Sequence, residues 1–140
     1  MLSPELMFKI VNALVLPFWA ILIFLPQKKW RNTVIYAFCM VMSTIYVVYV
    51  LMGISQLDMD SFGSIEGIKN LFSQDEAVVG GWIHYLTFDL LVGNWIVNQS
   101  IKHNMKHLLV IPCLLLCFMF GPAGYLLFSL VKLGKVKSLG

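Results

Sequence analysis

The stretch Gly80-Gly-Trp-Ile-His-Tyr-Leu-Thr-Phe-Asp-Leu-Leu-Val-Gly-Asn-Trp-Ile-Val-Asn98 is long and apolar enough to form a helix that crosses a bilayer, for which about 20 residues are needed. It nevertheless contains His84 and Asp89. Ionisable groups inside a membrane are costly, at roughly 2.5–3.5 kcal/mol for a central Asp on insertion scales. Because a chain rarely keeps such groups without a use, these two side chains are the first candidates for chemistry.

A helical wheel at about 100° per residue separates this helix into two faces. One narrow sector is purely aliphatic, and we expect it to face lipid; it contains Val79, Ile83, Leu86, Leu90 and Val97. The opposite arc is centred on Gly81, Phe88 and Val92, and we expect it to face protein. His84 and Asp89 flank that arc, about 140° apart at this spacing, so they should not bond each other. The pattern predicts that both point into one protein-lined cavity.

The composition of the whole chain is that of an integral membrane protein. Its 140 residues are 59% hydrophobic and only 12% charged, far from the average of soluble domains. A net charge of +3 gives no indication of a nucleic-acid partner. The three cysteines lie inside apolar runs without the usual spacing of metal ligands. We therefore expect no bound metal and no cofactor.

Four apolar segments, separated by short basic turns and one longer polar stretch, predict the fold. The expected spans are residues 5–25, 33–54, 76–98 and 108–131. Apolar residues recur at helical spacing near 64–72, which predicts a short amphipathic helix at the membrane surface. In the last span Pro122 is expected to kink the helix. The predicted fold class is all-α: a single integral membrane domain, a four-transmembrane-helix bundle with a short interfacial helix.

Four crossings would place both termini on one side of the membrane. One face would then carry five cations and the other four, so the loop charges nearly balance and lean towards termini outside. The five are Lys28, Lys29, Arg31, Lys102 and Lys106, and the four are Lys69, Lys132, Lys135 and Lys137. The first apolar run has no basic leader, and no Arg- and Ser-rich transit peptide precedes it. We therefore expect the inner membrane of a bacterium.

The candidate site consists of His84 and Asp89 as catalytic residues, with polar and aromatic side chains around them. The expected substrate-binding residues are Asn12, Tyr46, Trp82, Tyr85, Asn94 and Trp95. For Asn12 an interhelical hydrogen bond, and for Tyr46 helix packing, are the alternative interpretations. His103 and His107 are four residues apart but have no third ligand near them in the sequence, so ordinary interfacial histidines are favoured over a metal site.

Several short motifs resemble a known family. They are Asn12-x-Leu-x-x-Pro17-Phe-Trp19, Gly63-Ser-Ile-Glu-Gly67, Gly81-Trp-Ile-His-Tyr-Leu-x-Phe-Asp-Leu-x-Val-Gly93-x-Trp95-Ile, Pro112-Cys113 and Phe120-Gly-Pro-x-Gly124. Together they cover most of the chain, which is identified as a member of the abscisic-acid-deficient-4-like family. The resemblance implies a membrane protein related to a plant chloroplast protein needed to make neoxanthin from violaxanthin. That reaction rearranges a xanthophyll epoxide into an allenic alcohol.

The resemblance implies an isomerase for a carotenoid or another long isoprenoid. Epoxide opening needs an acid at the oxygen and a base for a carbon-bound proton; Asp89 and His84 are the candidates for these roles. The expected partners are membrane lipid, a carotenoid or isoprenoid ligand, and either another membrane protein or a second copy of the chain in a homo-oligomer. One alternative function is a non-catalytic pigment- or lipid-binding partner of another membrane enzyme. A small transporter is the other alternative.

Overall fold

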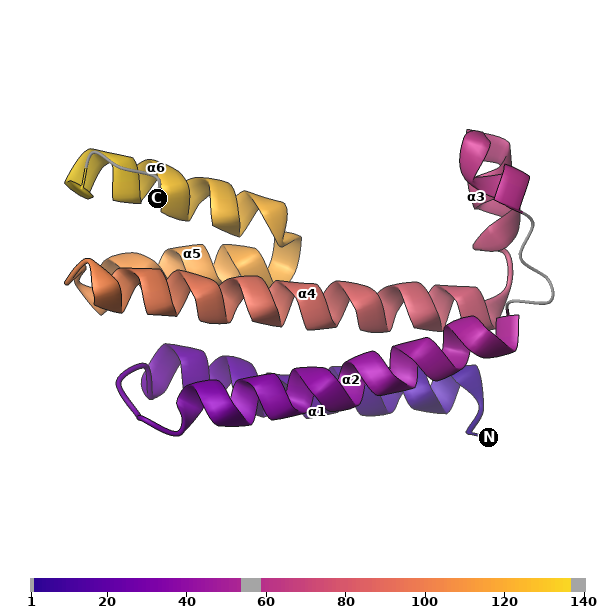
Figure 1. The fold of residues 1–140 in the computed structure, drawn as a ribbon, viewed down its shortest axis with the longest axis horizontal. Coiled ribbons are helices and arrows are strands. Elements are labelled where there is room, and N and C mark those ends of the chain that lie inside the picture. Colours follow the sequence, from indigo (N-terminus) through magenta and orange to yellow (C-terminus); the bar gives the residue numbers. More distant parts are fainter. Residues whose placement is uncertain (1, 54–58, 137–140) are drawn as a thin grey trace. The chain divides into compact units, whose positions relative to one another are not determined.

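The computed structural model describes residues 2–53 and 59–136, and within these ranges the regular secondary structure consists of helices, joined by short turns. The helices follow in the order α1 (Pro4–Phe24), α2 (Arg31–Gly53), the short 3-10 helix η2 (Met59–Gly63), α3 (Ile65–Leu71), α4 (Asp75–Lys102), α5 (His107–Phe120) and α6 (Pro122–Val136) (Figure 1). The predicted all-α class is confirmed. A short helix is present near 64–72 as expected, and its position at a membrane surface stays a prediction.

Among the described helices, two are both long and apolar enough to cross a membrane, α1 and α2. α4 has 28 residues, so at about 1.5 Å per residue it is long enough, but its polar side chains make it less apolar than a typical span. α5 is apolar but has only 14 residues. The four-span bundle is therefore not confirmed, and the single four-helix domain stays a prediction.

The chain divides into two compact units. Unit 1 comprises Met1–Val15 and Met40–Thr87, and unit 2 comprises Leu16–Cys39 and Phe88–Gly140. The division falls within three long helices, so that α1, α2 and α4 each contribute one part to each unit.

In unit 1 the start of α4 packs against α1, α2 and the end of α3. The Trp82 indole Nε1 donates a hydrogen bond of 3.0 Å to Asn12 Oδ1 of α1, and the Trp82 ring lies 5.4 Å from that of Phe8. The ring of Phe72, which follows α3, lies against Gly81, where an added Cβ would be only 2.7 Å from Phe72 Cε1. The small residue at position 81 therefore permits a close approach, as its place on the predicted protein-facing arc required.

The aliphatic sector of α4, expected to face lipid, is instead buried, and that prediction is wrong. Val79, Ile83, Leu86, Leu90 and Val97 are all 5% exposed or less. Phe88, near the centre of the opposite arc, is 55% exposed. The physical reason is that lipid tails are as apolar as leucine. An aliphatic stripe therefore suits a helix neighbour as well as it suits lipid, and composition does not distinguish the two.

In unit 2 the chain reverses direction between α5 and α6, which lie side by side and antiparallel (Figure 1). Gly121 occupies the reversal with φ of 21° and ψ of −82°, a conformation that L side chains rarely adopt. Pro122 is the first residue of α6, the position where a missing N–H and a fixed φ suit proline. A single kinked helix over 108–131 was therefore a wrong prediction: Pro122 starts a new helix.

The reversal returns the end of α6 to the end of α4. Lys132 Nζ of α6 donates a hydrogen bond of 3.0 Å to Gln99 Oε1 of α4. Arg31, at the start of α2, donates a hydrogen bond to Oδ1 of Asn98, the residue before Gln99 on α4. With 14 and 15 residues, α5 and α6 are about 21–23 Å long, shorter than the roughly 30 Å hydrocarbon core. We therefore expect a re-entrant hairpin, which enters and leaves the membrane on one side.

The hairpin predicts the sidedness of the C-terminal helix. Lys28→Cys and Lys135→Cys variants should react with a membrane-impermeant maleimide from the same side of sealed vesicles. The native cysteines Cys39, Cys113 and Cys117 are buried and supply the unlabelled background. Permeabilised vesicles serve as the control for reactivity. Labelling of the two positions from opposite sides would mean that 108–131 crosses the membrane once.

Close packing of the hairpin predicts a position-specific effect of alanine. A Cβ at Gly124 would overlap the backbone N and Cα of Cys117 on α5, whereas a Cβ at Gly134 would meet nothing within 4 Å. Gly124→Ala should therefore lower the free energy of unfolding by roughly 1–3 kcal/mol, as overpacking does. Gly134→Ala on the same helix should leave it within about 0.5 kcal/mol. Thermal melts of both variants in detergent measure the difference, and equal melting temperatures would contradict the packing described above.

Candidate functional site

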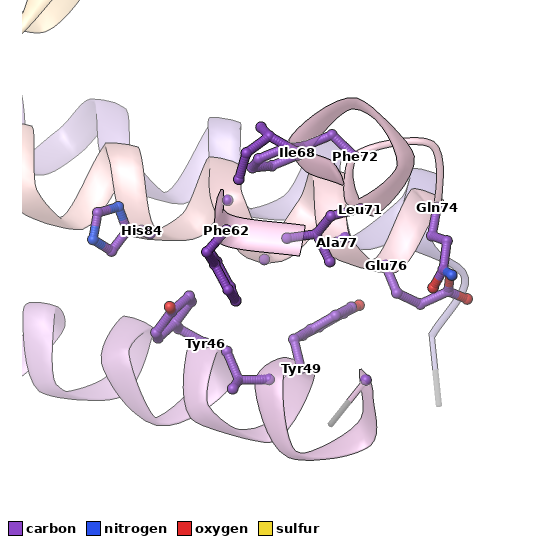
Figure 2. A pocket seen from close by; sticks show the side chains of 14 residues that line it. Tyr46, Tyr49, Phe62, Ile68, Leu71, Phe72, Gln74, Glu76, Ala77 and His84 are labelled. Atoms are coloured by element: carbon purple, nitrogen blue, oxygen red, sulfur yellow. The ribbon is translucent and has the colours of Figure 1, made fainter. Parts of the chain in front are cut away.

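A cavity with a volume of about 360 Å³ lies in unit 1. Its walls come from the end of α2, from the η2–α3 segment and from the start of α4 (Figure 2). The lining residues are Tyr46, Tyr49, Val50, Gly53, Phe62, Ile68, Leu71, Phe72, Gln74, Glu76, Ala77, Gly80, Gly81 and His84. We call this cavity the unit 1 pocket.

Most of the wall of the unit 1 pocket is apolar. The η2–α3 segment contributes Phe62, Ile68 and Leu71, and Phe72 follows directly. In Figure 2 the Phe62 side chain extends towards Tyr46 and Tyr49 of α2. Small-molecule sites are typically apolar clefts with a few placed polar groups. The unit 1 pocket has that character, and it suits the apolar part of a ligand.

The polar groups of the pocket lie on successive turns of α2 and α4. The rings of Tyr46 and His84 are 5.6 Å apart between centroids and inclined at 47°. One turn along α2, Tyr49 faces Gly80, where an added Cβ would lie 3.7 Å from the Tyr49 Cβ. Residue numbers therefore rise on one helix as they fall on the other, so the two segments run antiparallel. The two levels are separated by one helical pitch, about 5.4 Å.

Tyr49 is a buried polar group that lines the pocket. Its side chain is 4% exposed, and within the described residues its hydroxyl has no hydrogen-bond partner. A buried hydroxyl without a partner costs free energy, of the order of 1–3 kcal/mol. A ligand with a hydroxyl or ether oxygen could supply the missing partner.

Asp89 belongs to unit 2 and does not line the unit 1 pocket. Its carboxyl group lies against Gly121, where an added Cβ would overlap Oδ1. That places the carboxyl group beside the start of α6, where an acceptor oxygen suits the unpaired N–H groups of a helix N-terminus. Nearby, Cys117 Sγ lies 3.5 Å from the Asp89 carbonyl oxygen and donates to it. The surroundings of Asp89 thus point to a structural use, and its catalytic role stays a prediction.

The other predicted site residues are divided between the units. In unit 1, Trp82 bonds Asn12 as described and stacks on Tyr85 with ring centroids 5.3 Å apart. In unit 2, Asn94 is fully buried, and its amide nitrogen and oxygen lack partners in the described part of the chain. The Trp95 ring lies 5.4 Å from that of Tyr125. Of the predicted residues, Tyr46 and His84 line the unit 1 pocket.

Sequence reasoning missed Tyr49, Phe62 and Glu76 as pocket residues. Tyr49 lies three residues after Tyr46, a spacing that places both on one helix face. Tyr49 could therefore have been predicted as a pocket residue together with Tyr46. Glu76 lies in the first turn of α4, and its position in the pocket follows only from the approach of α2 and α3. Phe62 lies in a 3-10 helix, so the spacing of apolar residues along an α-helix could not identify it.

Two helices long and apolar enough to cross a membrane, together with a largely apolar pocket in unit 1, indicate a helical membrane protein. The family model described as ABA DEFICIENT 4-like matches residues 6–128, and the chain belongs to that family. The search of curated proteins and the search of solved structures both found no match. The bacterial inner membrane stays a prediction.

The contact between Asp89 and Gly121 predicts how substitutions at position 89 behave. Asp89→Asn keeps an acceptor oxygen at the start of α6, where Asn and Asp serve almost equally well, so its melting temperature should stay close to that of the wild type. Asp89→Leu removes the acceptor and should cost roughly 1–3 kcal/mol of stability. Detergent melts of the two variants provide the comparison. A strongly destabilised Asp89→Asn would mean that the charge itself is required.

Proposed function

We propose that the chain is an intramolecular isomerase for an oxygenated carotenoid or a related isoprenoid, and that it binds one oxygenated ring end in the unit 1 pocket. The observation that carries the proposal is the pairing of an apolar pocket with polar groups on two successive turns, Tyr46 with His84 and then Tyr49. Membership of the ABA DEFICIENT 4-like family supports the choice of ligand class, through the neoxanthin-related role that the resemblance implies.

The size of the pocket suits one end of such a molecule. A volume of about 360 Å³ lies near the lower limit of the roughly 300–1,000 Å³ typical of small-molecule sites. A polyene chain is much longer than a cavity of this size, so only the ring end would enter. The rest of the ligand would lie in lipid, where an apolar chain is stable without help from the protein.

The chemistry balances without an external reactant. Opening an epoxide breaks one C–O bond and leaves an alkoxide oxygen that takes up a proton. A neighbouring chain carbon loses a proton, and its C–H electron pair forms the new double bond of the allene. His84 would accept the carbon-bound proton, and the Tyr46 hydroxyl would donate to the oxygen. Tyr and His are both established general acid–base groups. Tyr49, one turn away, would bond a second oxygen on the ring.

A non-catalytic role in binding pigment or lipid is the second candidate. One observation favours it: Asp89, expected as the acid, lies in unit 2 and outside the pocket. The pocket therefore contains one of the two expected catalytic residues. In this alternative Tyr46, Tyr49 and His84 would hold a ligand that another membrane enzyme converts.

Substitutions in the pocket separate catalysis from binding. With a supplied xanthophyll epoxide, His84→Ala should lower product formation by about 10²–10⁴-fold, the usual contribution of a general base, and should still bind pigment. Tyr49→Phe should weaken binding about tenfold, since about 1.4 kcal/mol corresponds to one hydrogen bond. Chromatography of the products and the visible spectrum of the purified protein provide the two measurements. Tyr36→Phe, on the exposed side of α2, is the matched control.

The outcomes distinguish the two candidates. Undiminished turnover by folded His84→Ala would remove that residue from the mechanism. A wild-type protein that carries a polyene absorption band but forms no product would support the binding role instead. Loss of pigment from Tyr36→Phe as well as from Tyr49→Phe would show that the effect is not specific to the pocket.

A further inference from the structure

The charges of the chain are strongly segregated between its units. Eight of the ten Lys and Arg residues lie in unit 2, and Asp89 is its single acidic residue. The other six acidic residues lie in unit 1. Asp89 precedes Asn98 by nine residues, so on the α4 helix it lies about 13 Å away along the axis. Asp89 therefore lies more than two helical turns before Asn98, and the ionisable side chains of unit 2 are mostly cationic.

The seven of these cations that lie in the described residues gather at one end of unit 2. They come from the α1–α2 turn, from the α4–α5 turn and from the end of α6. The bonds of Arg31 to Asn98 and of Lys132 to Gln99 hold two of these segments at the last turns of α4. In Figure 1 the end of α6 lies at the same end as the α4–α5 turn. The reversal at Gly121 brings Lys132 and Lys135 to this end.

Two kinds of cation are present at this end. Arg31 and Lys132 are buried and bond amide oxygens of α4, which fixes the helix ends in place. A second group is exposed to the surroundings and consists of Lys28, Lys29, Lys102, Lys106 and Lys135. We call this exposed group the basic end. In unit 1, by contrast, Lys9 pairs with Glu5 and Lys69 pairs with Glu66.

Large apolar side chains lie next to the basic end in the sequence. Trp30, Phe24 and Leu108 are 45%, 77% and 79% exposed. Trp residues and lysines that flank apolar helices are typical of the interface between water and lipid. Clusters of Lys and Arg directly beside membrane helices bind anionic lipid headgroups. Exposed apolar groups beside the lysines also provide contacts for acyl chains, which a soluble anion would not use.

We propose that the basic end is a binding surface for the phosphate headgroups of anionic phospholipids, on the cytoplasmic leaflet. The lysines contact the phosphates, and Trp30 and Leu108 contact the glycerol and upper acyl region. The positive-inside rule assigns this end to the cytoplasmic side. This proposal concerns unit 2 and is independent of the ligand proposed for the unit 1 pocket.

The test measures lipid retention by the full chain. Purified protein in detergent is offered equal amounts of phosphatidylglycerol and phosphatidylcholine, and bound lipid is counted by native mass spectrometry. The wild type should retain phosphatidylglycerol about tenfold over phosphatidylcholine, and about 0.5 M salt should abolish the preference by screening. The triple variant Lys28→Gln, Lys29→Gln, Lys106→Gln should lose the preference at low salt.

The double variant Lys9→Gln, Lys69→Gln is the matched control, because it removes exposed lysines of unit 1 that already have acidic partners. It should retain the wild-type preference. Equal retention of both lipids by the wild type would overturn the proposal. A loss of the phosphatidylglycerol preference in the control that equals the loss in the triple variant would overturn it as well. Efficient competition by soluble glycerol phosphate would show a site for free anions and would overturn it as well. The salt titration on the wild type decides the matter even where the triple variant folds poorly.

Discussion

The contact between the Asp89 carboxyl group and the start of α6 is the constraint on which unit 2 depends. The first N–H groups of a helix have no partner within the helix, and inside a membrane no water replaces them. Pro122 begins α6 without an N–H, Gly121 adopts a positive φ, and the Asp89 carboxyl group lies beside them. An acidic residue that would be expensive in a uniform lipid-facing helix is thus favourable here, because it offsets the exposed end of a second helix.

The rest of unit 2 follows from that reversal. If residues 108–131 continued as one helix, Lys132 would lie far from Gln99 and could not bond it. Because the chain turns back, the lysines of α6 join those near residues 28–31 and 102–106. The turn also explains the glycine at position 124, since α6 passes so close to the backbone of Cys117 that no larger residue fits.

The residues at which most helices begin and end could be predicted from the sequence. Whether a helix face contacts lipid or another helix could not. The boundaries of α1, α2, α3 and the start of α4 lie within about two residues of those expected, because apolar period and turn residues determine them locally. Phe120-Gly-Pro-Ala-Gly124 is compatible with a kink and with a new helix. The tertiary contacts of Asp89 and Cys117 select the second. The aliphatic face of α4 likewise suits lipid and protein equally, so its burial depended on partners that the sequence does not specify.

The same distinction applies to the site. Tyr46 and His84 could be predicted because polar aromatic residues in apolar helices are unusual, whereas Phe62 and Glu76 join the pocket only through the fold.

The proposed ligand class gives Tyr49 a particular importance. A lipid-soluble ligand gains little from leaving lipid for an apolar wall, so discrimination rests on groups that lipid does not offer. The buried Tyr49 hydroxyl is such a group: a ring that carries an oxygen satisfies it, and an unoxygenated ring leaves it unpaired. Sites built to bond a substrate hydroxyl reject analogues that lack one far more strongly than apolar pockets reject a missing methylene. On this argument the specificity of the pocket comes from one buried hydroxyl, and the apolar residues around it serve to keep water from taking the place of the ligand.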